Sequence, residues 1–227
     1  MKIGIILTTD ERSKAYLQKI ISNKILIDEI ILMNEGVNSK DYSQECINEA
    51  KKCGFDISKP TKETLNEHKM KFKEFNFNDI NHIELIEYIR KKNFDFVIFT
   101  GGGILRKGIL SSGTKFVHFH PGIVPEYRGS TCFYYSIIKE NNCGVTAFIM
   151  NEGLDTGDVI YQKIFEKPNH VFIDDVYDSF IRSETMVDVL KNNQLEKKFK
   201  KQDQTSGNTF YIIHPVLKHI SILSCIR

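Results

Sequence analysis

Two histidines stand one residue apart at the end of an apolar run, in the sequence FVHFHPG. The imidazoles of His118 and His120 can take up or release a proton near neutral pH. Asp155 follows later in the chain, in the glycine-flanked acidic stretch NEGLDTGD. A carboxylate beside an imidazole fixes its tautomer and stabilises its charged form. These residue types in this order predict acid/base chemistry.

A metal site is the alternative that the spacing leaves open. Residues two apart in a strand point to the same face, so His118 and His120 can line one pocket. Pro121 favours an extended backbone at His120, which helps to hold that geometry. Two imidazoles on one face with a carboxylate also fit a metal site. A single histidine is more often structural than catalytic, and the combination of HxHPG with a later LDTG is what favours an active site.

The histidines need a strand to position them, and the apolar run over residues 115–119 predicts one. Three further runs of strand length cover residues 2–8, 29–33 and 94–100. Patterns of helical period separate them. Buried strands that alternate with helices predict an α/β fold, a Rossmann-like, mostly parallel sheet flanked by helices. Ligands bind beyond the carboxyl ends of such strands, and three candidate segments fall there: Thr8–Asp10, Gly101–Gly103 and His118–His120.

The helical patterns predict helices over residues 10–23, 41–53, 80–92 and 104–110. Residues 55–78 have a mixed pattern that fits a short strand, a short helix and loop.

The later part of the chain predicts two strands over residues 143–150 and 159–165, joined by the acidic loop. Asp174 or Asp175 can cap a helix that ends near Lys191. A strand over 209–213 and an apolar piece over 216–226 follow a lysine-rich segment. We expect a catalytic domain over 1–167 and a C-terminal helix and strand extension over 168–227 packed on it. The apolar tail docks on this domain or on a second subunit, which leaves a homodimer open.

The amino-acid composition limits the classes of molecule that this protein is expected to bind. The 227 residues include 31 Lys and Arg against 29 Asp and Glu, a net charge of +2. We therefore expect no nucleic-acid partner and, without a long apolar stretch, no membrane partner. No segment resembles a signal peptide. The five cysteines are odd in number and form no CxxC pair, which argues against a disulfide framework or a structural zinc site and favours a cytoplasmic location.

The stretch HFHPGIVPEYRGSTCFYYSII, followed by GVTAFIMNEGLDTGDVIYQ, resembles the folate-dependent formyltransferase family. This family includes glycinamide ribonucleotide transformylase, the catalytic domain of methionyl-tRNA formyltransferase, and nucleotide-sugar N-formyltransferases. Its pattern is N-x-H-P-(S/G)-x-L-P-x-Y-(R/P)-G, with a later acidic D-x-G loop. The close resemblance covers residues 94–165. It implies a Rossmann-like sheet and N10-formyltetrahydrofolate as the formyl donor, with no metal.

The resemblance also assigns roles. His120 matches the family's catalytic histidine and Asp155 its catalytic aspartate, while His118 stands where the family has an asparagine that hydrogen-bonds the formyl oxygen. An imidazole N–H can donate to the same oxygen. The departure also fits altered donor chemistry or lost activity. The segments that match the family's folate pocket supply the expected cofactor-binding residues: Gly102, Gly103, Ile104, Leu105, Glu152 and Gly153.

The implied reaction is acyl transfer to an amine, with the tetrahedral intermediate stabilised by His118 and His120 and the protons handled by His120 and Asp155. No covalent intermediate is needed, which disfavours Cys132 as a nucleophile. The wording of the motifs is most similar to bacterial sugar N-formyltransferases of the pseudaminic-acid type, so the expected acceptor is a nucleotide-linked amino sugar. Tyr127 and Arg128 are candidates to contact its sugar or phosphate, with loop packing as the alternative.

Other acceptors and functions stay open. Too few residues follow Phe165 for the C-terminal barrel that helps methionyl-tRNA formyltransferases to bind tRNA, so tRNA is disfavoured. A glycinamide ribonucleotide-type transferase fits the size of the chain. A non-catalytic or hydrolytic folate-binding relative would also fit the sequence. In that case the histidine at position 118, where the family has asparagine, would reflect the loss or change of activity.

Overall fold

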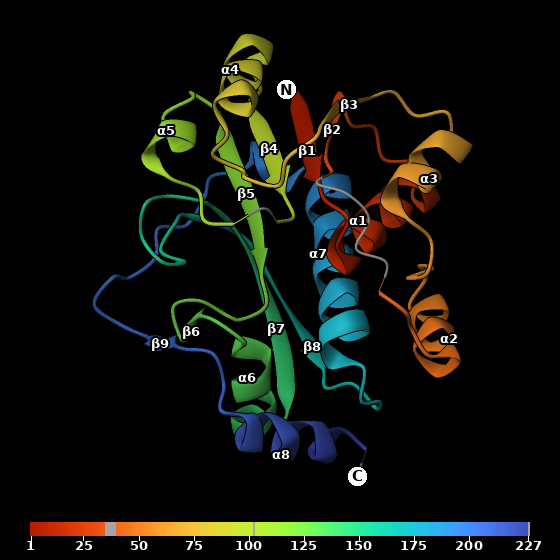
Figure 1. Ribbon diagram of the computed structural model, residues 1–227. Helices are drawn as coiled ribbons and strands as arrows, with labels where there is room; N and C mark the ends of the chain where they lie inside the picture. The colour runs from red at the N-terminus through yellow and green to blue at the C-terminus, as the bar shows by residue number, and fades with distance from the viewer. Residues whose placement is uncertain (35–39, 102, 227) are drawn as a thin grey trace. The chain divides into compact units, whose positions relative to one another are not determined.

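A computed structural model describes residues 1–34, 40–101 and 103–226 of the chain (Figure 1). The chain divides into two compact units, Met1–His118 and Phe119–Arg227. Its main sheet has seven strands in the order β3-β2-β1-β4-β5-β7-β8. The pairs β1–β2, β1–β4, β2–β3 and β4–β5 are parallel, and β7 and β8 are antiparallel. The predicted α/β class is confirmed: a mostly parallel, Rossmann-like sheet with flanking helices.

Three strands of the first unit, at Ile3–Leu7, Glu29–Met33 and Phe96–Phe99, are short apolar runs whose side chains are almost all buried. Parallel strands covered on both faces require such runs, because each face packs against other elements. The predicted strands are confirmed, and the last of them extends one residue further, so that both histidines lie within it. The strands are β1 (Ile3–Leu7), β2 (Glu29–Met33), β3 (Phe72–Phe75), β4 (Phe96–Phe99) and β5 (Lys115–His120), whose last two residues belong to the second unit.

The helices of the first unit begin and end near local signals. Asp10 caps α1, since its carboxylate accepts the Ser13 N–H at 2.8 Å. The ambiguous residues 55–78 form a helix and then a strand, and the short helix predicted from residue 104 begins only at Lys107. The helices are α1 (Glu11–Ser22), α2 (Gln44–Lys52), α3 (Thr61–Glu67), α4 (Ile83–Lys92) and α5 (Lys107–Leu110).

The second unit is built on the β7–β8 hairpin, whose strands β7 (Asn142–Ile149) and β8 (Val159–Glu166) were predicted within one or two residues. The helix expected to start at Asp174 or Asp175 begins later. Residues Ile173–Tyr177 form a π-helical turn, η1, and the regular helix α7 runs over Asp178–Lys191 without a side-chain cap. The two aspartates therefore lie inside the turn, so the cap prediction was wrong.

The C-terminal part forms a second, two-stranded sheet that was not predicted. In it, β6 (Tyr127–Gly129) pairs in parallel with β9 (Asn208–Phe210), the only regular part of the strand expected over 209–213. Two helices and a 3-10 turn complete the unit: α6 (Cys132–Glu140), η2 (Gln194–Glu196) and α8 (Pro215–Cys225).

The apolar tail forms α8, which lies against α6 (Figure 1). Ser221 on α8 is fully buried, and its hydroxyl donates to the carbonyl oxygen of Tyr134 at 3.3 Å. The tail thus docks on its own chain. A contact with a second subunit stays a prediction, and so does the domain boundary after residue 167.

In residues 1–34, 40–101 and 103–226, no helix is both long enough and apolar enough to cross a bilayer.

Candidate active site

The imidazole of His120 is buried at the end of β5 and lies beside Asp155. Its Nε2 is 2.8 Å from the carbonyl oxygen of Tyr127, and its Nδ1 is 3.4 Å from Oδ2 of Asp155. A carbonyl oxygen can only accept, so Nε2 carries the proton in the neutral ring. Nδ1 then has the lone pair. When Nδ1 takes up a proton, the positive charge of the ring faces the Asp155 carboxylate. A general base is stabilised in its protonated form by such a neighbouring anion.

The pKa of His120 is set by opposing effects. Burial lowers it most strongly, because the charged imidazolium loses its water. The Asp155 carboxylate raises the pKa, and the net direction is downward from the ordinary value of histidine. His120 is therefore a neutral base near pH 7, and Asp155 is placed to stabilise its charge after proton uptake.

Asp155 is held from two sides. Its Oδ2 accepts the backbone N–H of Gly129 at 2.7 Å, and its backbone oxygen accepts an N–H of the Gln202 side chain at 2.9 Å. The same amide donates to the oxygen of Gly157 at 2.7 Å. The backbone of Asp155 is left-handed, with φ of 52°, a conformation that aspartate tolerates better than most residues. The loop and a distant C-terminal side chain together fix the carboxylate.

The HPG turn leaves no room for a side chain next to the imidazole. A Cβ at Gly122 would lie 2.7 Å from the carbonyl oxygen of Tyr127 and 2.8 Å from Nε2 of His120. Glycine therefore permits the hydrogen bond that selects the tautomer. The carbonyl of Gly122 accepts from the fully buried Thr146 hydroxyl at 2.7 Å, which ties the turn to β7.

A buried ion pair on α7 supports the histidine strand. Arg182 Nε donates to Asp178 Oδ1 at 2.8 Å, and Arg182 Nη1 donates to the carbonyl oxygen of Phe119 at 2.7 Å. Both charged side chains are about nine-tenths buried, at 9% and 10% exposure. The pair therefore fastens α7 to the backbone next to His120. It was not predicted, although Asp and Arg at i and i+4 in an expected helix are a recognisable signal.

Tyr127 and Arg128 have structural partners in the described residues. The Tyr127 hydroxyl donates to Glu140 Oε1 at 2.6 Å. The Arg128 guanidinium donates to Gln202 Oε1 at 3.0 Å and to the backbone oxygens of Asp203 and Ser206 at 2.9 and 3.1 Å. Both residues are buried, at 2% and 7% exposure. The geometry favours the packing alternative, and a contact with sugar or phosphate stays a prediction.

Arg128 thus has a structural role in the second unit. By binding Gln202, it holds the residue that in turn binds the backbone of Asp155 and Gly157. The polar segment around Gln202 carried no sequence signal, because its role exists only once the chain has folded back along β6.

His118 lies on β5, half-buried, with its ring centroid 5.9 Å from that of Phe99 in the same unit. Its role beside the formyl oxygen stays a prediction. The expected folate residues are divided between the two units. Gly103, Ile104 and Leu105 belong to the first, Glu152 and Gly153 belong to the second, and Gly102 lies outside the described residues.

Each of the two segments exposes one apolar side chain. The side chain of Ile104 is 84% exposed, and that of Leu154, next to Asp155, is 58% exposed. Folate binding by these segments stays a prediction.

Two other chemistries can be compared with the geometry. Within the part of the chain that the structure describes, no three His, Cys, Asp or Glu side chains gather as a metal ion would need. Cys132 is fully buried, and burial, together with the Asp155 charge, raises the pKa of its thiol to about 12. A thiol that is protonated at neutral pH is a poor nucleophile.

Comparison with known proteins gives one family. The family model described as "Formyl transferase" matches residues 21–189. A curated relative, methionyl-tRNA formyltransferase from Finegoldia magna, is 29% identical over 106 residues, which are 45% of this chain and 34% of the relative. The chain thus aligns with about a third of the length of that relative.

Solved structures share the fold. A sugar N-formyltransferase from Shewanella sp. has a TM-score of 0.60 at 15% identity, with 99% of this chain and 88% of that chain covered. An N-formyltransferase from Helicobacter canadensis, in complex with folinic acid and dTDP-3-aminofucose, has a TM-score of 0.58 at 16% identity, with 100% and 80% covered. At these identities the likeness establishes the fold.

Acid should destabilise the protein through His120. Because the folded-state pKa is lowered, the unfolded chain binds the proton more readily. The imidazole's contribution is therefore fully present above the unfolded pKa of about 6.5 and is lost as the pH falls toward the folded pKa. We expect a loss of up to about 1.4 kcal/mol per pH unit below 6.5 from this group. Urea unfolding at several pH values, with His120→Asn beside the wild type, measures it. A variant with an unchanged pH slope would contradict this assignment.

Arg182→Met should cost about 3–5 kcal/mol of unfolding free energy, because it leaves the buried Asp178 carboxylate without a counter-charge. The double variant Asp178→Leu/Arg182→Met should regain much of this loss, since no unpaired charge remains. Arg90→Met removes an exposed arginine and should stay within about 0.5 kcal/mol of the wild type. Urea unfolding compares the four proteins. Equal stability of Arg182→Met and Arg90→Met would show that the ion pair does not support the strand.

Proposed function

Because the chain belongs to the formyl transferase family, we propose that it transfers a formyl group from N10-formyltetrahydrofolate to an amino group of a small acceptor. The observation that carries the proposal is the buried His120 with its Nδ1 3.4 Å from Asp155. The acceptor that we propose is a nucleotide-linked amino sugar.

In the proposed reaction the folate supplies the formyl carbon. The acceptor amine forms a bond to this carbon, the bond from the carbon to N10 breaks, and one proton passes from the amine to N10. His120 Nδ1 takes this proton transiently, because burial keeps the free imidazole neutral. The imidazolium then donates to the Tyr127 carbonyl and faces the Asp155 carboxylate. An N–H of His118 stabilises the oxyanion, the role of the family's asparagine.

Two sets of relatives bear on the acceptor. The Shewanella and Helicobacter canadensis proteins favour an amino sugar by the names and ligands of their structures. The curated sequence relatives favour methionyl-tRNA, since they are methionyl-tRNA formyltransferases. Methionyl-tRNA is therefore the second candidate. Glycinamide ribonucleotide and water, the latter for a hydrolase, complete the set to be tested.

His120→Ala and Asp155→Ala should each lower turnover by about 10²–10⁴-fold, the usual contribution of a positioned acid or base. Release of tetrahydrofolate is followed with dTDP- and UDP-linked amino sugars, glycinamide ribonucleotide, methionyl-tRNA, or no acceptor. His219→Ala on the exposed face of α8 and Asp158→Ala in the acidic loop are the matched controls.

The acceptor panel separates the candidates. Folate release only with amino-sugar nucleotides supports the proposal, and release without any amine identifies a hydrolase. No release with any acceptor, although the folate binds, identifies a binding module. Near-normal turnover of His120→Ala or Asp155→Ala would make the site assignment wrong.

His118→Asn should keep turnover within about tenfold, because the amide restores the donor that the family pattern has at this position. His118→Leu removes every donor and should lower turnover by about 10²–10³-fold. Single-turnover measurements with saturating folate compare both with the wild type. Loss of activity in His118→Asn would show that His118 does something that an asparagine cannot, and full activity in His118→Leu would exclude it from catalysis.

A further inference from the structure

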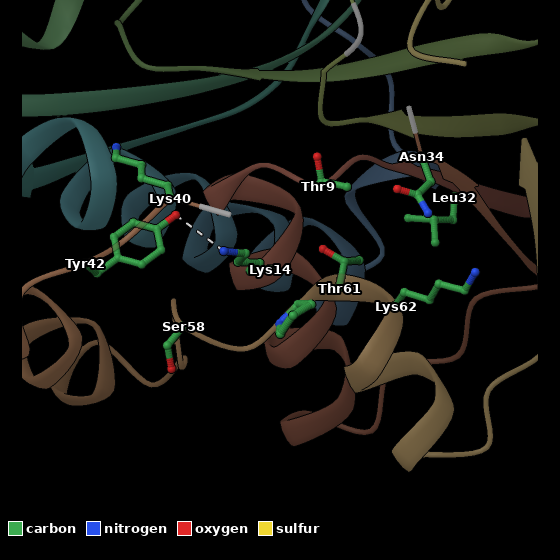
Figure 2. A pocket seen from close by; sticks show the side chains of 10 residues that line it. Thr9, Lys14, Leu32, Asn34, Lys40, Tyr42, Ser58, Thr61 and Lys62 are labelled. Atoms are coloured by element: carbon green, nitrogen blue, oxygen red, sulfur yellow. Dashed lines mark hydrogen bonds between the residues drawn. The ribbon is translucent and has the colours of Figure 1, made fainter. Parts of the chain in front are cut away.

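A cavity of about 170 Å³ lies in the first unit at the carboxyl ends of β1 and β2, beside α1 and α3 (Figure 2). Its lining includes Leu32 from β2, Thr9 from the turn after β1, and Lys14 from α1. The cavity lies on the β2 side of β1, whose other neighbour in the sheet is β4. Ligands of open α/β sheets bind in crevices beyond the carboxyl ends of the strands.

Lys14 supplies a cation at this cavity. Its ammonium donates to the carbonyl oxygen of Ile57 at 2.7 Å and to the Tyr42 hydroxyl at 3.4 Å, the contact drawn in Figure 2. An ammonium has three N–H donors, and these contacts with described residues use two. Burial lowers the pKa of Lys14, because the charge has lost part of its water. An anion in the cavity would replace that water.

The ring of Tyr42 is fixed as one wall. Its hydroxyl donates to Glu11 Oε1 at 2.7 Å, and Lys14 Nζ lies 4.9 Å from the ring centroid. Leu32 and Pro60 add apolar surface. A dry cavity of about 150 Å³ is known to hold one benzene molecule, so this volume suits a single six-membered ring.

The charges that line the cavity are positive. Lys14, Lys40 and Lys62 are among the described lining residues, and no carboxylate is. Lys40 and Lys62 each form an ion pair with a carboxylate that does not line the cavity. Lys40 Nζ lies 3.6 Å from Glu11, and Lys62 Nζ lies 2.8 Å from Glu74. The carboxylates of Glu11, Asp10 and Asp56 act on Lys14 as well, and what distinguishes Lys14 is its partial burial, which makes it the cation through which the cavity would select its ligand.

We propose that this cavity binds a small organic anion, a single planar ring that carries one phosphate or carboxylate group. The ring packs against Tyr42, Leu32 and Pro60, and the anionic group contacts Lys14 with the Thr9 hydroxyl as a second donor. The site belongs to the first unit and uses none of the residues of the formyl-transfer proposal. Failure of either proposal leaves the other standing.

The test uses phenyl phosphate and benzoate as probes on the full chain, with binding followed by calorimetry and by backbone amide shifts. We expect saturable binding at about 1 mM of at least one probe, and its identity distinguishes a phosphate from a carboxylate site. Inorganic phosphate alone and phenol alone should each bind more weakly than phenyl phosphate. Lys14→Met should weaken binding about tenfold or more, since a charge-assisted hydrogen bond is lost.

Matched variants make the result specific. Lys19→Met lies on the same helix away from the lining and should bind as the wild type does, and Tyr42→Phe should retain more affinity than Tyr42→Ala. Unchanged binding by Lys14→Met overturns the proposal. Measurements on the wild type alone also test the proposal, so the test holds even if Lys14→Met fails to fold. The proposal is overturned if neither probe saturates, or if the amide shifts are confined to residues after His118.

Discussion

The second unit is arranged to keep one imidazole buried and still basic. Burial alone would make His120 a very weak base, because the protonated ring loses the water that solvates its charge. The Asp155 carboxylate offsets that cost, while the Tyr127 carbonyl fixes which nitrogen has the lone pair. A weak base that becomes charged only briefly is what removal of a proton from an attacking amine requires.

This arrangement explains why residues far apart in sequence converge on so small a region. The backbone of Asp155 is left-handed, and the Gly129 N–H and the Gln202 amide hold this residue by hydrogen bonds. Gln202 is in turn held by Arg128, and the pairing of β6 with β9 brings the C-terminal segment alongside. The C-terminal segment is therefore part of the support of the candidate site.

The fold and the His120–Asp155 pair could be predicted because their signals are local. Continuous apolar runs mark parallel strands, and the HPG and LDTG turns need glycine and proline at fixed positions. The supports could not be predicted in the same way. Gln202 and the β6–β9 pairing depend on contacts between distant segments. The sequence left open whether Arg128 contacts substrate or packs within the loop, because burial of a loop arginine is decided only by tertiary structure. The late start of α7 reflects the π-helical turn over Ile173–Tyr177, which has no sequence pattern of its own.

The choice of acceptor follows a different physical logic from the proton transfer. Relatives named for sugar and for tRNA acceptors share this fold, so the fold and a histidine–carboxylate pair do not by themselves select the amine. Selection must come from side chains that contact the acceptor beyond its nitrogen. The candidates for that task, Tyr127 and Arg128, already have hydrogen-bond partners within the protein. A side chain that must bind a substrate has to keep unsatisfied donors or exposed surface, and the buried Tyr127 and Arg128 expose only 2% and 7% of theirs.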